Sequence, residues 1–110
     1  QYRRSLKGLI LLMDIRHPLK DYDRQMIVWA AVSEMPVHIL LTKCDKLKRG
    51  PAKTALLGVK KELKAHERWI SVQLFSSHNH EGMDELQRTL NWWLTLPEDD
   101  VAAIEDDLAD

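Results

Sequence analysis

A short polar segment, residues 42–45 with the sequence Thr-Lys-Cys-Asp, follows an apolar run and could read a nucleotide base. The Asp45 carboxylate, held at a strand end, can accept two parallel hydrogen bonds from the ring N–H and the exocyclic amine of guanine. Adenine offers no such pair of donors, and hydrogen bonds to charged groups contribute roughly 1.5–3 kcal/mol each. The Lys43 stem can lie along a flat base, and the Thr42 hydroxyl can hold the loop.

Two serines in a second polar segment support this interpretation. Ser76 and Ser77 directly follow the next apolar run, residues 70–75, and their backbone N–H groups could donate to the guanine carbonyl oxygen. Taken alone, residues 42–45 fit an ordinary polar loop equally well. The two segments together, separated by one helical stretch, form a much rarer combination than either alone.

Three apolar runs predict the strands that must position these loops. Residues 9–13 and 37–41 are nearly continuous in apolar character, which is typical of strands covered on both faces. Residues 70–75 alternate, as an edge strand would. Loops after parallel strands meet at one edge of a sheet, where ligands of such folds bind, so residues 42–45 and 76–82 are expected to lie together.

Segments of helical period lie between and after these runs. The order predicts an α/β fold with three mainly parallel strands alternating with three helices. Adjacent Trp92 and Trp93 point to different faces of the last helix, so only one of them can be fully buried. The expected helix starts are Asp21 or Asp23, Pro51, and Met83 or Asp84.

Charge is distributed unevenly along the chain. All 16 Lys and Arg lie within residues 1–96 with ten of the 17 acidic residues, so this body carries a net charge of +6. The other seven acidic residues lie in residues 97–110, which contain no basic residue. We therefore predict one domain, residues 1–96, followed by an acidic tail, residues 97–110, that is expected to be disordered. A cationic body suits contact with a polyanion.

The sequence argues against several other classes of site. Cys44 is the only cysteine, so no internal disulfide can form and a reducing, cytoplasmic setting is expected. The longest nearly apolar run, residues 8–13, is far shorter than the roughly 20 residues of a membrane helix, so no membrane contact is predicted. The two histidines of residues 78–81 make an incomplete metal site, and none is predicted.

The loop after the first strand invites a functional interpretation as well. Arg16 and His17 could pair with a carboxylate or a phosphate, or simply fix the turn before Pro18; the turn role is favoured. Asp14 resembles a catalytic carboxylate only by its place at a strand end, and we assign it a structural role. No catalytic residue is predicted in this chain.

Four segments resemble a known family: residues 12–18 (Leu-Met-Asp-Ile-Arg-His-Pro), Asp23, residues 42–47 (Thr-Lys-Cys-Asp-Lys-Leu) and residues 75–77 (Phe-Ser-Ser). With them, residues 2–95 resemble the C-terminal half of a translation-factor-type P-loop GTPase, specifically of the EngB (YihA/YsxC) ribosome-assembly family. The Asp-x-Arg-His-Pro pattern distinguishes this family from other GTPases.

The resemblance implies binding of GTP and GDP and slow GTP hydrolysis with Mg²⁺ by the complete protein, in the bacterial cytoplasm. It also implies a role in assembling the large ribosomal subunit, through contact with that subunit or its RNA, and thereby in normal cell division and septation. By position, Thr42, Lys43 and Asp45 would form the guanine-specificity motif, and Ser76 and Ser77 the backbone-donor motif. The alternative is a nucleotide-independent α/β module that binds ribosomal RNA or protein through its cationic body.

The sequence departs from the family where the phosphates should bind. A phosphate-binding loop needs the pattern G-x-x-x-x-G-K-[ST], and Gly8, Gly50, Gly58 and Gly82, the only glycines, do not form it. The Mg²⁺ ligands are likewise absent, so we expect this chain alone not to hydrolyse GTP. The first strand would also lack its usual neighbour, and its exposed edge is expected to promote self-association.

Overall fold

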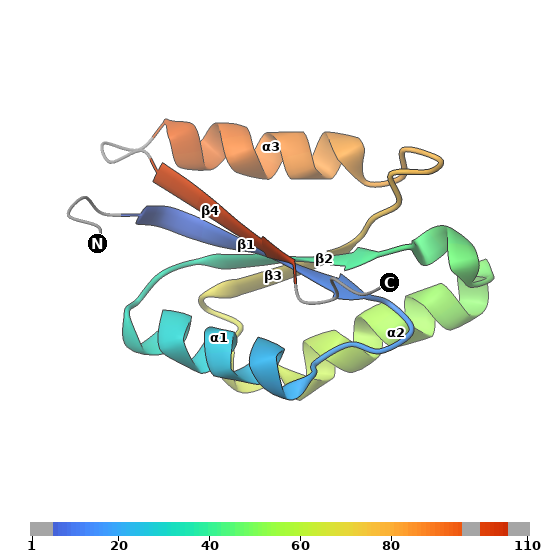
Figure 1. The fold of residues 1–110 in the computed structure, drawn as a ribbon, viewed down its shortest axis with the longest axis horizontal. Helices are drawn as coiled ribbons and strands as arrows, with labels where there is room; N and C mark the ends of the chain where they lie inside the picture. Colours follow the sequence, from blue (N-terminus) through green and yellow to red (C-terminus); the bar gives the residue numbers. More distant parts are fainter. Residues whose placement is uncertain (1–5, 96–99, 106–110) are drawn as a thin grey trace.

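A four-stranded parallel sheet forms the centre of the molecule (Figure 1). The computed structural model describes residues 6–95 and 100–105. The strands lie in the order β3-β2-β1-β4, so β1 and β2 are central and β3 is an edge, as its alternating pattern predicted. The strands are β1 (Leu6–Asp14), β2 (Val37–Thr42), β3 (Ile70–Leu74) and β4 (Asp100–Glu105).

Helices cover both faces of this sheet. Figure 1 shows α1 and α2 on one face and α3 on the other. The predicted alternation of three strands with three helices is confirmed, and β4 adds a fourth strand. The helices are α1 (Asp21–Val32), α2 (Arg49–Glu62) and α3 (Met83–Leu94), with short 3-10 turns at Cys44–Lys46 and Lys64–His66.

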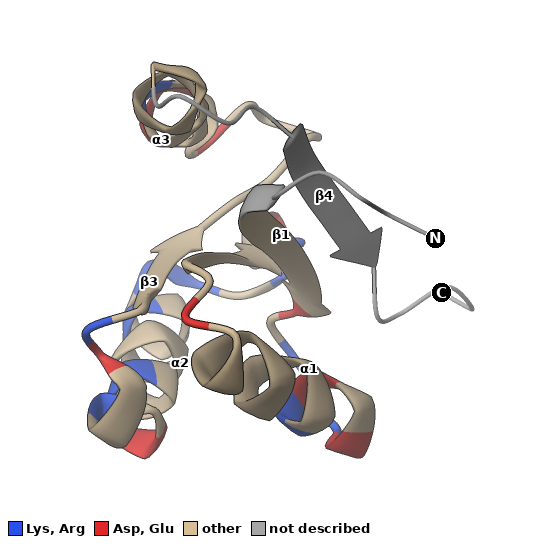
Figure 2. Cartoon of the chain, turned by 90° about the vertical axis from the view of Figure 1, so that its left-hand side faces the viewer, with Lys and Arg blue, Asp and Glu red and all other residues tan. Residues whose placement is uncertain are grey.

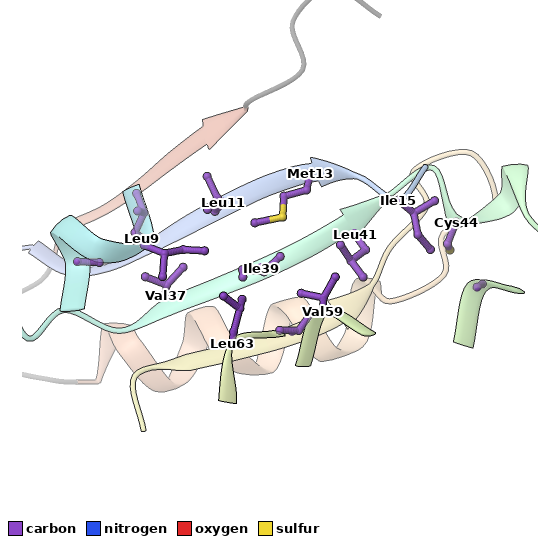
Figure 3. Packing of buried hydrophobic residues seen from close by; sticks show 14 residues of the cluster. Leu9, Leu11, Met13, Ile15, Val37, Ile39, Leu41, Cys44, Val59 and Leu63 are labelled. Carbon is purple, nitrogen blue, oxygen red and sulfur yellow. The ribbon is translucent and has the colours of Figure 1, made fainter. Parts of the chain in front are cut away.

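The central strands are apolar on both sides because each side packs against helices. Odd-numbered side chains of β1 and β2 point to the α1 and α2 side and form the larger cluster (Figure 3). On the other side, Ile10 and Leu40 pack with Trp93 of α3. The labelled members of the larger cluster on these two strands are Leu9, Leu11, Met13, Val37, Ile39 and Leu41.

The acidic tail differs from its prediction at residues 100–105, which form β4 on the free side of β1. Residues 101–104 are Val-Ala-Ala-Ile, an uncharged run that can pair with the backbone N–H and C=O groups of β1. β1 is therefore not an exposed edge, and the expected self-association through it loses its basis. Residues 97–99 and 106–110 of the tail lie outside the described residues.

The two adjacent tryptophans have opposite environments, as the helical pattern predicted. Trp93 is 5% exposed and Trp92 is 66% exposed. The Trp93 ring lies over Gly8 of β1 so closely that a Cβ added at Gly8 would stand 2.8 Å from ring atoms. Trp93 therefore fixes α3 against the centre of the sheet.

Replacing each tryptophan in turn tests this packing. Trp93→Ala should lower the free energy of unfolding by about 3–5 kcal/mol, because it removes a large buried side chain and leaves a cavity. The matched control, Trp92→Ala, should change it by no more than about 0.5 kcal/mol. Urea unfolding followed by far-UV circular dichroism measures both, and equal losses would contradict the assigned packing.

Candidate base-binding site

The loops after β1 and β2 and the end of β3 are joined by hydrogen bonds at the carboxyl edge of the sheet. The Ile15 N–H donates to the Thr42 carbonyl at 3.0 Å, and the Cys44 N–H donates to the Phe75 carbonyl at 3.1 Å. The Thr42 hydroxyl donates to the Met13 carbonyl at 3.2 Å, so it holds its loop as predicted. Parallel pairing has thus brought the predicted polar segments to one place.

Lys43 turns the chain sharply after β2. Its backbone is left-handed, with φ of 62°, a conformation that few residues other than glycine adopt. Its ammonium Nζ lies 3.5 Å from Oδ2 of Asp14, so the side chain extends from the β2 loop towards the end of β1. Lys43 also lines a hollow together with Thr42, Asp45 and Ser77.

Asp14 is a buried anion that receives several donors from its own loop. Its side chain is 1% exposed, and Arg16 donates to it from the backbone N–H at 2.8 Å, from Nε at 2.9 Å and from Nη2 at 2.6 Å. Hydrogen bonding from the Arg16 side chain, helped by the Arg16 backbone and by Lys43, outweighs burial and holds the pKa of Asp14 well below its usual range. The His17 N–H donates to the Asp14 carbonyl at 2.9 Å, so the segment forms a turn, while the Arg16 side chain pairs with a carboxylate, which was the less favoured alternative.

Asp45 is held by one serine side chain. The Ser76 hydroxyl, which is fully buried, donates to Asp45 Oδ1 at 2.7 Å, and this hydrogen bond is the main cause of the lowered pKa of Asp45. The carboxylate is therefore ionised at neutral pH and fixed in orientation. Each carboxylate oxygen has two lone pairs, so Asp45 can still accept two donors from a base.

Ser76 differs from its predicted role as a backbone donor, whereas Ser77 does not. The Ser76 N–H donates to the Glu81 carbonyl at 2.9 Å, so in this structure it is engaged within the loop. The exposed Ser77 has an N–H that donates to none of the described residues. The sequence predicted two backbone donors; in this structure the Ser77 N–H has no acceptor among the described residues, and the Ser76 hydroxyl orients Asp45.

A hollow of about 330 Å³ lies among these loops. It brings together Thr42, Lys43, Asp45 and Ser77, four of the five residues predicted for the site, while Ser76 lies behind Asp45. A mixture of apolar walls and a few polar groups suits a flat heterocycle with a polar edge. The remaining lining residues are Leu12, Lys46, Phe75 and His78.

Cys44 belongs to the core and not to the hollow. It is 3% exposed, and its Sγ lies 3.4 Å from Oε1 of Glu81. Burial, together with the Glu81 carboxylate, raises the pKa of the Cys44 thiol to about 11. The thiol therefore stays protonated at neutral pH and serves packing.

Two other classes of feature are missing from the part of the chain that the structure describes. Within the residues that the structure describes, no three His, Cys, Asp or Glu side chains gather closely enough to hold a metal ion. In residues 6–95 and 100–105, no helix has the length and apolar character needed to cross a membrane.

The Asp14 interactions predict a specific dependence of stability on pH. Because the folded-state pKa of Asp14 lies below the unfolded value of about 3.9, its stabilisation is complete above that value and is lost as the pH falls towards the folded pKa. Asp14→Asn should lower the free energy of unfolding by about 1.5–3 kcal/mol at pH 7, and this difference should shrink between about pH 5 and pH 2.

Urea unfolding at a series of pH values measures this difference. Asp21→Asn is the matched control, because it makes the same change at an exposed position on α1. A difference between wild type and Asp14→Asn that stays constant down to the acid end of the series would contradict the role assigned to Asp14.

Three curated proteins of similar sequence share one name. No protein-family model matches the sequence. The chain is 51% identical over 102 residues to the "Probable GTP-binding protein EngB" of Aromatoleum aromaticum, covering 93% of this chain and 47% of that protein. Proteins with the same name from Azoarcus sp. and Acinetobacter baylyi are 54% and 56% identical over 93 and 85 residues; these matches cover 84% and 77% of this chain and 44% and 36% of theirs. The chain thus spans less than half the length of these relatives.

Solved structures support the fold. The apo form of translation elongation factor SelB from Methanococcus maripaludis superposes with a TM-score of 0.70 at 19% identity, over 80% of this chain and 20% of SelB. The same factor in complex with the GTP analogue GppNHp gives a TM-score of 0.68 at 18% identity, over 81% of this chain and 20% of that one. The TM-scores establish a shared fold, and the matches at 51–56% sequence identity establish the relationship. The chain is therefore a relative of the EngB proteins, and it matches their C-terminal part.

Proposed function

We propose that this chain provides the guanine-reading part of a GTP-binding protein and that Asp45 reads the base. The observation that carries the proposal is the Asp45 carboxylate, ionised, oriented by Ser76 and placed on the wall of the hollow. The relatives at 51–56% identity are named as GTP-binding proteins, which supports the same conclusion.

The base would lie in the hollow with its polar edge towards Asp45. The carboxylate would accept the ring N–H and the exocyclic amine, while the Ser77 N–H would donate to the carbonyl oxygen of guanine. The Lys43 stem and the Phe75 ring would supply apolar contact to the faces of the base. Adenine would leave Asp45 without donors and would present an amine to the Ser77 N–H, so the site would reject it.

At full length, we propose a GTPase that converts GTP to GDP and phosphate. The phosphate-binding loop, the Mg²⁺ ligands and the groups that orient water would come from sequence beyond this chain, which spans less than half of its relatives. This chain alone should then not hydrolyse GTP. We further propose a cytoplasmic role in assembly of the large ribosomal subunit, and through it in normal cell division.

Asp45→Asn tests the base-reading role directly. The asparagine amide can donate to the second carbonyl of xanthine but repels the guanine amine, so affinity for GDP should fall by about 100-fold or more and affinity for XDP should rise. Isothermal titration calorimetry should be done on the protein at full length, meaning this chain with any sequence that precedes it.

The matched control is Asp84→Asn, which makes the same substitution at an exposed position on α3, outside the hollow. It should leave both affinities unchanged. If GDP binding by Asp45→Asn stays within about twofold of wild type, Asp45 does not read the base and the proposal loses its central residue.

A basic face on α2 suits contact with ribosomal RNA. It favours the second candidate function, a nucleotide-independent interaction module that binds ribosomal RNA through its cationic surface. Arg49, Lys53 and Lys60 are spaced by four and seven residues, close to whole helical turns, so they share one face of the helix. All three are exposed, and Figure 2 shows Lys and Arg along α2. Glu62 is the one acidic residue of this helix.

Removing this basic face should weaken RNA binding and its dependence on salt. The triple change of Arg49, Lys53 and Lys60 to Gln should reduce the slope of log K against log salt concentration by about two to three units, because about three phosphate contacts are lost. Filter binding with RNA of the large subunit measures the slope, and an unchanged slope would remove α2 from the interface. The control changes three exposed basic residues outside α2 to Gln: Arg24, Arg68 and Arg88.

A further inference from the structure

A line of buried polar side chains crosses the α3 side of the sheet from β2 to the loop after β3. His38 is 1% exposed and Gln73 is 2% exposed. His38 Nε2 lies 2.6 Å from Gln73 Oε1, and His38 Nδ1 lies 2.6 Å from the Ser71 hydroxyl. Neither His38 nor Gln73 lines the hollow, and buried polar groups paired this closely fix one arrangement of the chain.

The Gln73 amide joins the two ends of the loop that carries Ser76. Its Nε2 donates to the Leu74 carbonyl at 3.0 Å and to the Gly82 carbonyl at 2.8 Å. Leu74 is the last residue of β3 and Gly82 directly precedes α3, so one side chain holds both ends of residues 75–81.

Hydrogen-bond chemistry fixes the orientation of this amide. The carbonyl groups of Leu74 and Gly82 can only accept, so the amide nitrogen of Gln73 must face them. Gln73 Oε1 then faces His38, whose Nε2 must carry a proton to donate to it. The Leu74 and Gly82 carbonyl groups therefore determine which way the amide of Gln73 points, and the hydrogen bond from His38 holds it in that orientation.

Gly82 makes this close arrangement possible. Its backbone is left-handed, with φ of 87°, and an added Cβ would stand 2.2 Å from the Leu74 carbonyl oxygen and 2.6 Å from Gln73 Nε2. Any other residue at this position would displace the amide or the strand end. The absence of a side chain at Gly82 therefore lets the Gln73 amide reach both carbonyl groups.

We propose that Gln73, held by its hydrogen bond with His38, is a positioning residue for guanine recognition. It fixes both ends of the loop in which the Ser76 hydroxyl meets Asp45 at 2.7 Å and Ser77 lines the hollow. This inference rests on the proposed function, and it assigns a role to two buried residues that lie outside the base-reading motifs.

Loss of the Gln73 hydrogen bonds should lower the selectivity between guanine and other bases. A loss of stability alone should not change this selectivity. IDP carries hypoxanthine, which lacks the exocyclic amine that Asp45 would accept, so the ratio of GDP to IDP affinity reports how well Asp45 is aligned. A substitution that only lowers the free energy of unfolding should leave this ratio unchanged in the fraction of protein that is folded.

Gln73→Met keeps the length of the side chain and removes its donors. In the protein at full length, it should weaken GDP binding by about tenfold and lower the GDP to IDP affinity ratio by at least about threefold, measured by calorimetry well below the melting temperature. Gln87→Met makes the same change on the exposed face of α3, and it should leave both values unchanged.

The outcomes separate this inference from the proposed function. If wild type does not bind GDP, or if Asp45→Asn has no effect, the proposed function fails and this inference fails with it. If wild type and Asp45→Asn behave as expected but folded Gln73→Met keeps the wild-type ratio, Gln73 is only structural and the inference alone is overturned.

Should Gln73→Met not fold, the wild-type protein decides the question by NMR. The side-chain amide protons of Gln73 should exchange slowly with solvent, and their signals should differ between the GDP and IDP complexes. Amide protons that exchange as fast as those of exposed Gln87, or that do not distinguish the two complexes, would overturn the inference.

Discussion

The parallel register of β1, β2 and β3 is the constraint on which the site depends. Asp14 pairs with Thr42 across β1 and β2, and Leu41 pairs with Leu74 across β2 and β3. Each strand therefore ends at the same level, and the polar residues that follow must meet. Asp45 and Ser76 are 31 residues apart in sequence, yet their side chains are joined by a hydrogen bond of 2.7 Å. A slip of one residue in either pairing would turn the alternating side chains to the wrong faces and separate the loops.

Two carboxylates at this edge of the sheet have opposite roles because their surroundings differ. Asp14 is buried and accepts several hydrogen bonds from Arg16, so it organises the chain and has little capacity for a ligand. Asp45 is partly exposed at the hollow and is held by Ser76, which orients it and leaves lone pairs available. Lys43 links the two regions, since it lies on the wall of the hollow and its ammonium lies near Asp14.

The two faces of the sheet support the site by different means. The face under α1 and α2 is an apolar cluster, and hydrophobic burial there gives the strands their stability (Figure 3). The face under α3 combines Trp93, packed on Gly8, with the polar pair His38 and Gln73. Apolar packing is tolerant of small shifts, whereas hydrogen bonds have strict geometry. The polar pair therefore defines the position of the loop after β3 more narrowly than packing alone could.

The sequence by itself determined the α/β fold class, the order of the first three strands and the three helices, and residues 42–45 and 76–77 as a candidate site. Apolar runs and helical periods are local properties, and polar residues after a strand have few other places to lie. Only the tertiary structure decided that Ser76 acts through its hydroxyl, that Lys43 reaches Asp14, and that Gln73 closes its loop, because these contacts depend on register and on side-chain orientation. It also decided that residues 100–105 pair with β1, since the partner for that pairing lies at the other end of the chain.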